Sequence, residues 1–323
     1  MNSRLSQIVS GLKYQRSKLG IWPTGIERLQ SLDTEHGRLW CKREDLSGKL
    51  YGGNKVRKLE WLLPNAAQLS RSILTMGATG SNHLVATCKY APQFGLKVHA
   101  VVSPQPVTPH VVRNAEIMEA SEATLWRCDG EFAVPFTISR AWLSIKRKTG
   151  ESPVWIRAGG SNPIGSLGWV EAALEIAEQV KEGLMPEPSC IVVPLGSGGT
   201  VAGLLVGLQL SGLQSKVYGV RVVSRFLVNR RSTLSLARAT LRLIDRDKKL
   251  DPSRLIVDHD FYGEGYGVES PAGLAAIESA AECGLKLEPT YTGKALAAGL
   301  YAMKTGAISG DILYIDTVSS VEV

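Results

Sequence analysis

Short runs of apolar and β-branched residues alternate along this chain with longer stretches in which apolar residues recur every three or four positions. The short runs predict strands at Ile73–Met76, Lys97–Val102, Ala123–Trp126, Val154–Ile156, Cys190–Leu195, Lys216–Val222 and Ile312–Ile315. The longer stretches predict helices at Lys55–Leu69, Asn82–Phe94, Pro109–Ala120, Pro163–Lys181 and Thr200–Leu210. Alternation of this kind is typical of parallel sheets that are covered by helices on both faces. The pattern therefore predicts an α/β fold.

The stretch Ile191–Leu210 holds twenty residues without a charge, which is the length of a membrane-spanning helix. Gly199, Gly203 and Gly207 have the spacing of a helix-packing motif found in membranes. However, Pro194 and the glycine-rich run after it interrupt the first half of the stretch. We therefore predict a buried strand, a glycine loop and a buried helix in place of a membrane span.

Length and composition restrict the class of protein further. The chain has 323 residues, of which 44% are hydrophobic and 21% charged, so it is long enough for two domains or one large α/β unit. These ordinary values exclude a disordered or fibrous protein. The net charge is +7, and residues 221–254 hold ten Lys or Arg against three Asp. A solvated helical face explains this block best, because no nucleic-acid-binding motif accompanies it. A nucleic-acid-binding or regulatory protein is kept as the non-enzymatic alternative.

The cysteines and the first residues indicate a compartment. Five cysteines without a C-x-x-C pair make a disulfide framework and a zinc site improbable, and we expect no metal. Residues 1–20 lack an apolar core of signal-peptide length, and the sequence has no Asn-x-Ser/Thr sequon. We therefore expect a cytoplasmic protein that binds neither membrane nor nucleic acid.

Three loops that precede predicted helices could carry chemistry. In the first, two glycines allow a sharp turn at Tyr51–Asn54, and Lys55 opens the helix. The positive end of the helix dipole would lower the pKa of Lys55 and leave more of the neutral amine that imine formation needs. The alternative is an ordinary solvated lysine on an amphipathic helix.

The other two loops suit anions. In Gly77–His83, Ser81 is placed to cap a helix whose free N–H groups could bind a carboxylate, although capping alone would explain it too. In Gly196–Thr200, backbone N–H groups, two hydroxyls and the next helix suit a phosphate. No Lys follows these glycines as in a Walker loop, and Val201 replaces the third glycine of a dinucleotide fingerprint. A single phosphate is therefore favoured over a pyrophosphate.

A lysine amine, a carboxylate site and a monophosphate site are what pyridoxal 5'-phosphate and an amino acid require. Five motifs together resemble the 1-aminocyclopropane-1-carboxylate deaminase and D-cysteine desulfhydrase family of fold-type-II pyridoxal-phosphate enzymes. They are Gly52-Gly53-Asn54-Lys55 with Arg57-Lys58-Leu59-Glu60, Ser81-Asn82-His83, Ala158-Gly159-Gly160-Ser161-Asn162-Pro163-Ile164-Gly165, Gly196-Ser197-Gly198-Gly199-Thr200 and Tyr291-Thr292-Gly293-Lys294-Ala295. The resemblance covers the chain from about Trp22 to Thr317.

The resemblance implies a fold and a domain arrangement. The expected fold is two open, mostly parallel three-layer α/β domains of the tryptophan synthase beta-like type. We expect a larger cofactor-binding domain made of residues 1–58 and 158–323, and a smaller inserted domain at 59–157. A homodimer is also expected from the family.

The resemblance further implies a role for each matching residue. Lys55 would carry the cofactor as an internal aldimine, and Asn82 would lie beside the cofactor's 3-hydroxyl. The cofactor's phosphate would be bound by Lys58 and by the loop of Gly196, Ser197, Gly198, Gly199 and Thr200. Ser81, Tyr291 and Tyr266 match catalytic residues, and Ser81, Asn82 and His83 match substrate-binding ones. Thr317 is expected to place a hydroxyl against the pyridine nitrogen.

Departures from the family pattern bear on the substrate. Gly80 replaces a Gln before the Ser-Asn-His motif, and Leu84 and Val85 replace more polar residues after it. Asp316-Thr317-Val318-Ser319 replaces a closing His-Thr-Gly-Gly. The family members that open a cyclopropane ring have Glu directly after the active-site Tyr, where this chain has Thr292.

The expected activity is therefore that of a lyase or deaminase acting on a small amino acid. We expect D-cysteine desulfhydrase-like β-elimination to pyruvate, ammonia and sulfide. The alternatives are 1-aminocyclopropane-1-carboxylate deamination or a divergent amino-acid substrate.

Overall fold

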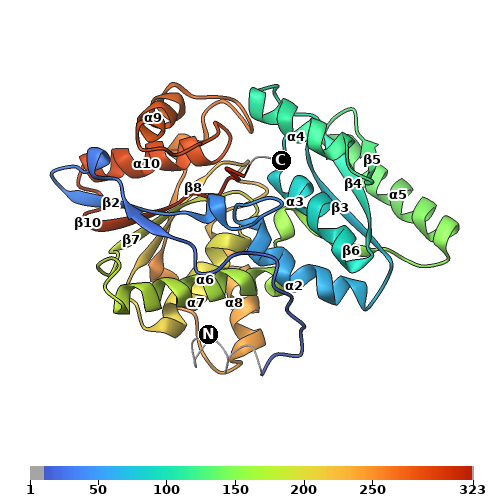
Figure 1. Cartoon of the computed structure of the whole chain (residues 1–323), viewed down its shortest axis with the longest axis horizontal. Coiled ribbons are helices and arrows are strands. Elements are labelled where there is room, and N and C mark those ends of the chain that lie inside the picture. Colours follow the sequence, from blue (N-terminus) through green and yellow to red (C-terminus); the bar gives the residue numbers. More distant parts are fainter. Residues whose placement is uncertain (1–10, 322–323) are drawn as a thin grey trace.

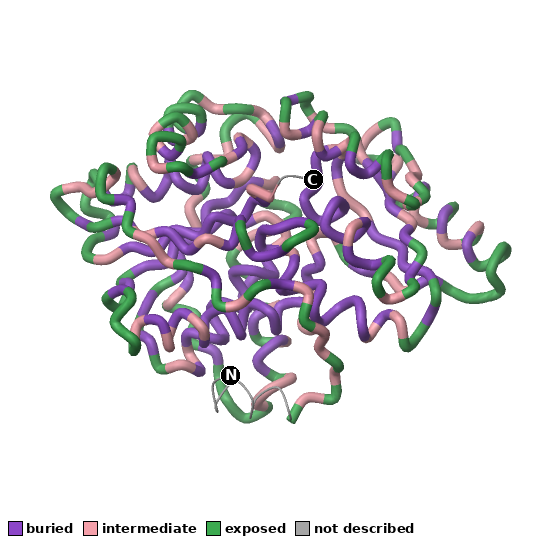
Figure 2. The backbone as a smooth tube through the Cα atoms, viewed as in Figure 1, coloured by how far each residue is buried: buried purple, intermediate pink, exposed green. Residues whose placement is uncertain are grey.

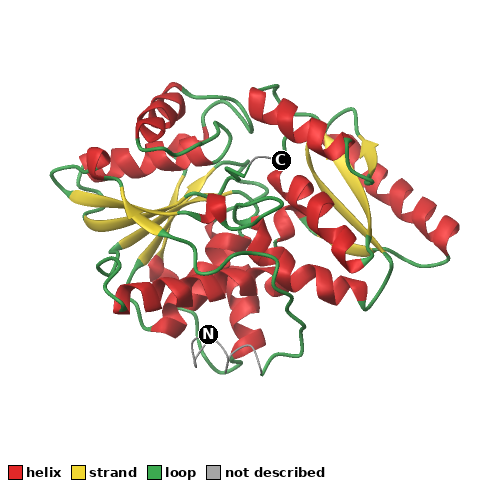
Figure 3. Ribbon diagram, viewed as in Figure 1, coloured by secondary structure: helices red, strands yellow, loops and turns green. Residues whose placement is uncertain are grey.

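The computed structural model describes residues 11–321, and its strands form two separate sheets (Figures 1 and 3). The larger sheet has six strands in the order β1-β2-β10-β7-β8-β9, and only the β1–β2 pair is antiparallel. These strands are β1 (Ile26–Arg28), β2 (Gly37–Lys42), β7 (Cys190–Leu195), β8 (Lys216–Arg221), β9 (Leu255–Asp258) and β10 (Gly310–Ile315).

The smaller sheet has four parallel strands in the order β5-β4-β3-β6. They are β3 (Ser72–Ala78), β4 (Lys97–Ser103), β5 (Thr124–Arg127) and β6 (Val154–Ile156). All four lie between β2 and β7 in the sequence, so the chain completes this sheet before it returns to the larger one. The predicted boundaries of an inserted domain at residues 59 and 157 stay a prediction, and α2 (Lys55–Ala67) runs across the first of them.

Helices cover both faces of the larger sheet. Side chains alternate along a strand, and in β7 Ile191 and Val193 pack with α6, α7 and α8 while Cys190 and Val192 face α9 and α10. In Figure 1 the first three helices lie below this sheet and the other two above it. The helices are α6 (Pro163–Lys181), α7 (Gly199–Ser211), α8 (Arg230–Ile244), α9 (Pro271–Glu282) and α10 (Thr292–Lys304).

The smaller sheet is layered in the same way. Ile73 in β3 packs with α2, α3 and α4, whereas Leu74 faces α5. The bounds are α3 (Asn82–Tyr90), α4 (Pro109–Glu119) and α5 (Val134–Thr149). Figure 2 shows buried backbone concentrated in the two sheets and in the helices between them.

Short 3-10 turns complete the described secondary structure. They are η1 (Gln30–Leu32), η2 (Glu44–Leu46), η3 (Ala91–Phe94), η4 (Glu131–Ala133), η5 (Ala158–Gly160), η6 (Pro252–Arg254) and η7 (Asp260–Tyr262).

The predicted strands and helices are present, with some differences at their ends. The helix expected over Asn82–Phe94 ends at Tyr90 and continues as η3, because Pro92 cannot donate the backbone hydrogen bond that an α-helix needs. The strand expected at Lys216–Val222 ends at Arg221. The strands β1, β2 and β9 and the helices α5, α9 and α10 were not predicted from the sequence, and α8 was predicted only as a helical face within residues 221–254.

The stretch that matched a membrane helix in length forms β7, a glycine loop and α7, as predicted. Its glycines bring α7 against α6. A methyl group at Gly207 would lie 2.5 Å from the Cβ of Ala173, and one at Gly203 would meet Trp169. Within residues 11–321, no helix is both long and apolar enough to cross a membrane.

The basic segment has the structure of a solvated helix on the core. Leu234, Ala237 and Leu241 on α8 are buried, and Arg230, Arg238 and Arg242 on the same helix are exposed. This amphipathic arrangement confirms the helical-face interpretation of the block.

Candidate functional site

The loop before α2 places Lys55 at the first position of that helix. Gly53 has a left-handed φ of 85°, which a residue with a side chain rarely adopts. A methyl group at Gly53 would also lie 2.7 Å from the carbonyl oxygen of Thr317, which accepts the N–H of Asn54 at 3.1 Å. Ser319 accepts the N–H of Gly52 through its hydroxyl at 2.8 Å. The divergent Asp316–Ser319 segment thus packs directly against the Lys55 loop.

The amine of Lys55 is bound to its neighbour and linked to the glycine loop. Lys55 Nζ donates to Asn54 Oδ1 at 2.6 Å, and Asn54 Nδ2 donates to Thr200 Oγ1 at 3.1 Å. Burial lowers the pKa of Lys55 to about 8, while the charge of Glu288 acts in the opposite direction. The direction of the shift is the expected one, and desolvation contributes most to it. The solvated-lysine alternative is wrong for this residue.

Lys58 and the glycine loop converge on Ser161. The hydroxyls of Ser161 and Ser197 are hydrogen-bonded at 2.7 Å, and Gly199 N donates to Ser161 Oγ at 3.0 Å. Lys58 Nζ donates to Ser161 Oγ at 3.2 Å and to the carbonyl of Gly159 at 2.9 Å. Backbone N–H groups, hydroxyls and a buried ammonium at a helix N-terminus form a cradle for a phosphate.

The cradle has no space for larger side chains. A methyl group at Gly199 would lie 2.5 Å from Ser161 Oγ and 3.0 Å from Lys58 Nζ. Burial, and then the charge of Lys55, lower the pKa of Lys58 well below its usual value, and a bound phosphate would balance these two amines. The residues therefore fit the cofactor that the sequence implies. Ser161 was not among the predicted site residues, although the Gly159-Gly160-Ser161 motif gave a signal for it.

The N-terminus of α3 holds Ser81 and Asn82. Ser81 Oγ caps this helix by accepting the N–H of Leu84 at 3.3 Å, as predicted. Asn82 Oδ1 accepts three hydrogen bonds of 2.7 to 2.9 Å, which fixes the orientation of its amide. The three donors, none of them predicted, are Tyr51 Oη, His110 Nε2 and Asn114 Nδ2.

His83 lies deeper in the protein than we would expect for a residue that binds the substrate. Its Nε2 lies 3.0 Å from Thr75 Oγ1 in β3, and its buried Nδ1 has no hydrogen-bond partner among the described residues. Burial, together with the charges of Lys55 and Lys58, lowers its pKa well below the usual value. The ring is therefore neutral and bonded to the smaller sheet, and its binding role stays a prediction.

Tyr291 and Tyr266 meet at their hydroxyls, which are hydrogen-bonded to each other. Their rings are in an edge-on arrangement with centroids 6.0 Å apart. A methyl group at Gly196 would lie 3.3 Å from the Tyr291 ring, so the pair stands beside the glycine loop. Burial, and then the neighbouring Tyr266, raise the pKa of Tyr291 well above its usual value. Tyr291 is therefore protonated throughout the physiological range.

The carboxylate of Glu288 shapes the segment that carries Tyr291. It accepts the N–H groups of Thr290, Tyr291 and Thr292 at 2.8 to 2.9 Å. The sequence analysis did not identify Glu288. Thr292 Oγ1 donates to the carbonyl of Glu288 at 3.1 Å, so this hydroxyl is used locally. Thr317 is buried beside the Lys55 loop and stays the candidate for the pyridine nitrogen.

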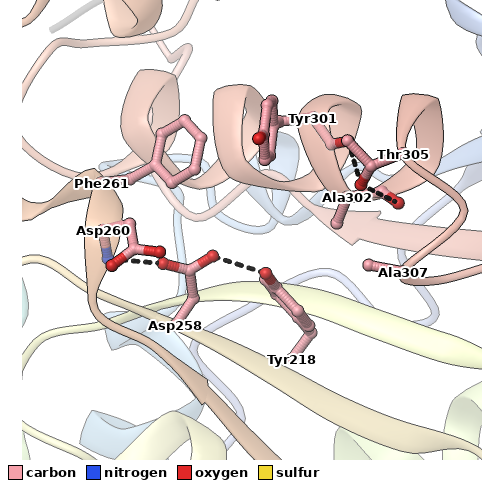
Figure 4. A pocket seen from close by; sticks show the side chains of 8 residues that line it. All are labelled: Tyr218, Asp258, Asp260, Phe261, Tyr301, Ala302, Thr305 and Ala307. Atoms are coloured by element: carbon pink, nitrogen blue, oxygen red, sulfur yellow. Dashed lines mark hydrogen bonds between the residues drawn. The ribbon is translucent and has the colours of Figure 1, made fainter.

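A separate pocket of about 290 Å³ lies between α10 and the ends of β8 and β9 (Figure 4). Phe261 and Tyr301 form one of its walls, with ring centroids 5.9 Å apart. The eight residues that line it are Tyr218, Asp258, Asp260, Phe261, Tyr301, Ala302, Thr305 and Ala307. They include none of the predicted site residues.

Comparison with known proteins bears on the family, the fold and the cofactor. The family model for pyridoxal-phosphate dependent enzymes matches residues 17–317. A D-cysteine desulfhydrase from Klebsiella pneumoniae strain 342 is 33% identical over 316 residues, which cover 94% of each chain. A putative 1-aminocyclopropane-1-carboxylate deaminase from Pyrococcus abyssi is 31% identical over 321 residues, covering 98% of this chain and 94% of the relative.

A solved structure of a 1-aminocyclopropane-1-carboxylate deaminase homologue superimposes with a TM-score of 0.84 at 28% identity, covering 98% of this chain and 95% of the other. The comparisons confirm the family resemblance and the expected fold. Because the family model and two relatives above 30% identity extend over nearly all of its length, the chain belongs to the pyridoxal-phosphate-dependent enzymes.

Proposed function

We propose that this enzyme is a lyase that eliminates the β-substituent of a small amino acid, with D-cysteine or a close analogue as its substrate. The observation that carries the proposal is one low-pKa lysine that is linked to a glycine loop with two further features. Lys55 is joined to this loop through Asn54 and Thr200, and the loop forms part of the phosphate cradle and also adjoins a protonated tyrosine pair.

The cofactor would be held by the residues that surround these features. Lys55 would bind it covalently, while Lys58, Ser161, Ser197 and the N-terminus of α7 would hold its phosphate. Asn82, fixed by its three donors, would present its amide nitrogen to the 3-hydroxyl. When bound, pyridoxal phosphate supplies an electron sink for charge that develops at the substrate Cα.

The chain's own groups then move protons. The pKa of Lys55 at about 8 gives a sizeable neutral fraction near physiological pH, so its Nζ can take the proton from the substrate Cα. The Tyr291–Tyr266 pair holds a hydroxyl proton that can be donated to the departing thiolate. Ser81 and the N–H groups at the start of α3 bind the substrate carboxylate.

The residue after the active-site tyrosine favours elimination over opening of a cyclopropane ring. The Thr292 hydroxyl is bound to Glu288, and Thr317, the candidate for the pyridine nitrogen, provides no full negative charge to keep that nitrogen protonated. Loss of a β-thiol needs less charge delocalised into the ring, because the leaving group departs with the electron pair. The Klebsiella relative is described as a D-cysteine desulfhydrase, which supports the same substrate.

Deamination of 1-aminocyclopropane-1-carboxylate is the second candidate. It is supported by the description of the Pyrococcus relative as a putative deaminase of that compound and by the solved homologue.

Product analysis separates the two. Purified holoenzyme is incubated with D-cysteine and, separately, with 1-aminocyclopropane-1-carboxylate, and the oxoacid is identified. We expect D-cysteine and one water molecule to give pyruvate, ammonia and hydrogen sulfide, with little 2-oxobutanoate from the cyclopropane. Efficient 2-oxobutanoate formation without sulfide release from D-cysteine would show that the argument from Thr292 is wrong.

A cytoplasmic homodimer is part of the same proposal. All five cysteines are free thiols, which supports a reducing compartment. Light scattering during gel filtration should give twice the chain mass of 34.9 kDa.

A further inference from the structure

Lys294 is a fully buried lysine that the proposed reaction does not use. It lies in the first turn of α10, three positions after Tyr291. In the described part of the chain, no carboxylate forms an ion pair with its ammonium. Burying an ammonium is costly unless polar groups replace the lost water, so the groups that satisfy it indicate what it does.

Those groups belong to the loop that carries Tyr266. Lys294 Nζ donates to the carbonyl of Tyr262 at 2.7 Å and lies within 3.4 Å of the carbonyl of Gly265, the residue directly before Tyr266. It also lies 5.8 Å from the centroid of the Tyr262 ring. Between the two carbonyls, Gly263 has a φ of 70° and a ψ of −150°, a conformation that only glycine adopts readily.

The loop is attached to α10 at a second point. Lys294 and Tyr301 are seven positions apart, so they lie on one face of this helix. Figure 4 shows Phe261 next to Tyr301 on one side of the surface pocket. The Phe261–Tyr301 contact holds the start of the loop, whereas Lys294 reaches the residue next to Tyr266.

We infer that Lys294 is a positioning residue, which holds the 262–266 segment so that the hydroxyl of Tyr266 meets that of Tyr291. The bond to Gly265 fixes the backbone from which Tyr266 projects, and Tyr291 is carried by the same helix start as Lys294. The effect of Lys294 on catalysis rests on the proposed function. Its effect on the position of the loop does not depend on that function.

Hydrogen exchange of the wild-type and variant holoenzymes tests the loop without any substrate. We expect Lys294→Met to speed the exchange of amides in the 259–268 segment, because the two carbonyls lose their donor. Lys304→Met makes the same substitution at an exposed position on the same helix and should change nothing there. Lys294→Gln keeps a hydrogen-bond donor, so its exchange rate should lie between those of the wild type and Lys294→Met. This variant takes the place of Lys294→Met in the experiment if Lys294→Met does not fold. Unchanged exchange in both Lys294 variants would overturn the inference.

A double-mutant cycle tests whether the effect on catalysis passes through Tyr266. With D-cysteine, Lys294→Met should lower kcat roughly tenfold, the size expected for a lost charged hydrogen bond at a catalytic group. In a Tyr266→Phe background, the same substitution should have no further effect on kcat. Independent, multiplicative losses would contradict the positioning role. If wild-type enzyme eliminates from neither substrate while the loop exchange changes as expected, the proposed function fails and the structural role of Lys294 stands.

Discussion

At the scale of single residues, the central feature is a lysine whose amine is easy to deprotonate. Lys55 was identifiable from sequence because its signal is local, a Gly-Gly-Asn turn followed by a helix. Its burial was not identifiable in that way, since it arises from tertiary packing, in which residues from the other end of the chain such as Thr317 close over the adjacent Gly53. The direction of the pKa shift was therefore predictable from the sequence, whereas the desolvation that contributes most to it was not.

The pKa of Lys55 predicts how the apoenzyme captures its cofactor as pH changes. The pKa of an ordinary lysine is about 10.4, so its neutral fraction keeps rising through pH 10. Because the pKa of Lys55 is lowered to about 8, its neutral fraction rises through pH 8 and then levels off. The rate at which visible absorbance develops after pyridoxal phosphate is added should therefore rise from pH 6.5 and reach a plateau above about pH 9.

Borohydride reduction identifies the amine responsible. It should fix the cofactor to the peptide containing Lys55, and Lys55→Ala should remove both the label and the absorbance while the protein still folds. Label on Lys58 or Lys294, or a rate that still climbs at pH 10, would contradict the assignment.

At the scale of elements, the glycine loop between β7 and α7 is held by contacts that no single motif reveals. Lys58 on α2 and Ser161 after η5 are 103 positions apart in the sequence, yet they bond to each other and to the start of α7. The loop itself was predictable, because its glycines follow a continuous apolar strand. Ser161 was not assigned, because its role depends on the packing of α6 against α7.

Substitution at Gly199 tests this cradle. Its backbone is compatible with a side chain, but a methyl group there would lie 2.5 Å from Ser161 Oγ and 3.0 Å from Lys58 Nζ. Displacing these groups costs about 1 to 3 kcal/mol, so Gly199→Ala should weaken cofactor binding by roughly 5- to 150-fold. Equilibrium titration of the apoenzyme measures the loss.

Gly25→Ala is the matched control, since a methyl group at Gly25 would meet no atom within 4 Å. It should bind the cofactor as the wild type does. Unchanged affinity in Gly199→Ala would place the phosphate elsewhere.

The elements that were predicted and those that were missed differ in how clearly their own residues indicate that they are buried. The strands β7 and β10 are covered on both faces and read as continuous apolar runs. The strand β2, Gly-Arg-Leu-Trp-Cys-Lys, includes two basic residues. The end residue Lys42 can be buried because Glu175 and Gln179 on α6 and the carbonyl of Thr24 accept its ammonium protons. Such a strand can be recognised only when its tertiary partners are known. The helix α8 was predictable as a helical face but not in its bounds, because its many arginines face solvent while Leu234 and Leu241 reach the core.

At the scale of the whole molecule, the site depends on the approach of two sheets. Ser81 and Asn82 follow β3 of the smaller sheet, whereas the glycine loop, Tyr266 and Tyr291 belong to segments of the larger one. Gln105, after β4 of the smaller sheet, spans the two. Its Oε1 accepts the N–H of Gly80 at 3.1 Å, and its Nε2 lies 3.5 Å from where a methyl group at Gly267 would be. The glycine at position 80 leaves space for this carboxamide, since a methyl group there would lie 3.0 Å from Gln105 Nε2.

We therefore expect Gln105→Ala to loosen the contact between the Ser81 loop and the Tyr266 loop. The lost hydrogen bond and the space left behind are worth about 1 kcal/mol, which predicts a kcat/KM for D-cysteine roughly five-fold lower. The loss should fall mainly on KM, because Gly80 adjoins the end of α3 that is proposed to bind the substrate carboxylate, while Lys55 and the proposed phosphate cradle are untouched. Gln93→Ala, at an exposed position in η3, makes the same substitution away from the site and should leave both constants unchanged. A Gln105→Ala enzyme with the kinetics of the Gln93→Ala control would show that this bridge between the sheets does not help to hold the substrate.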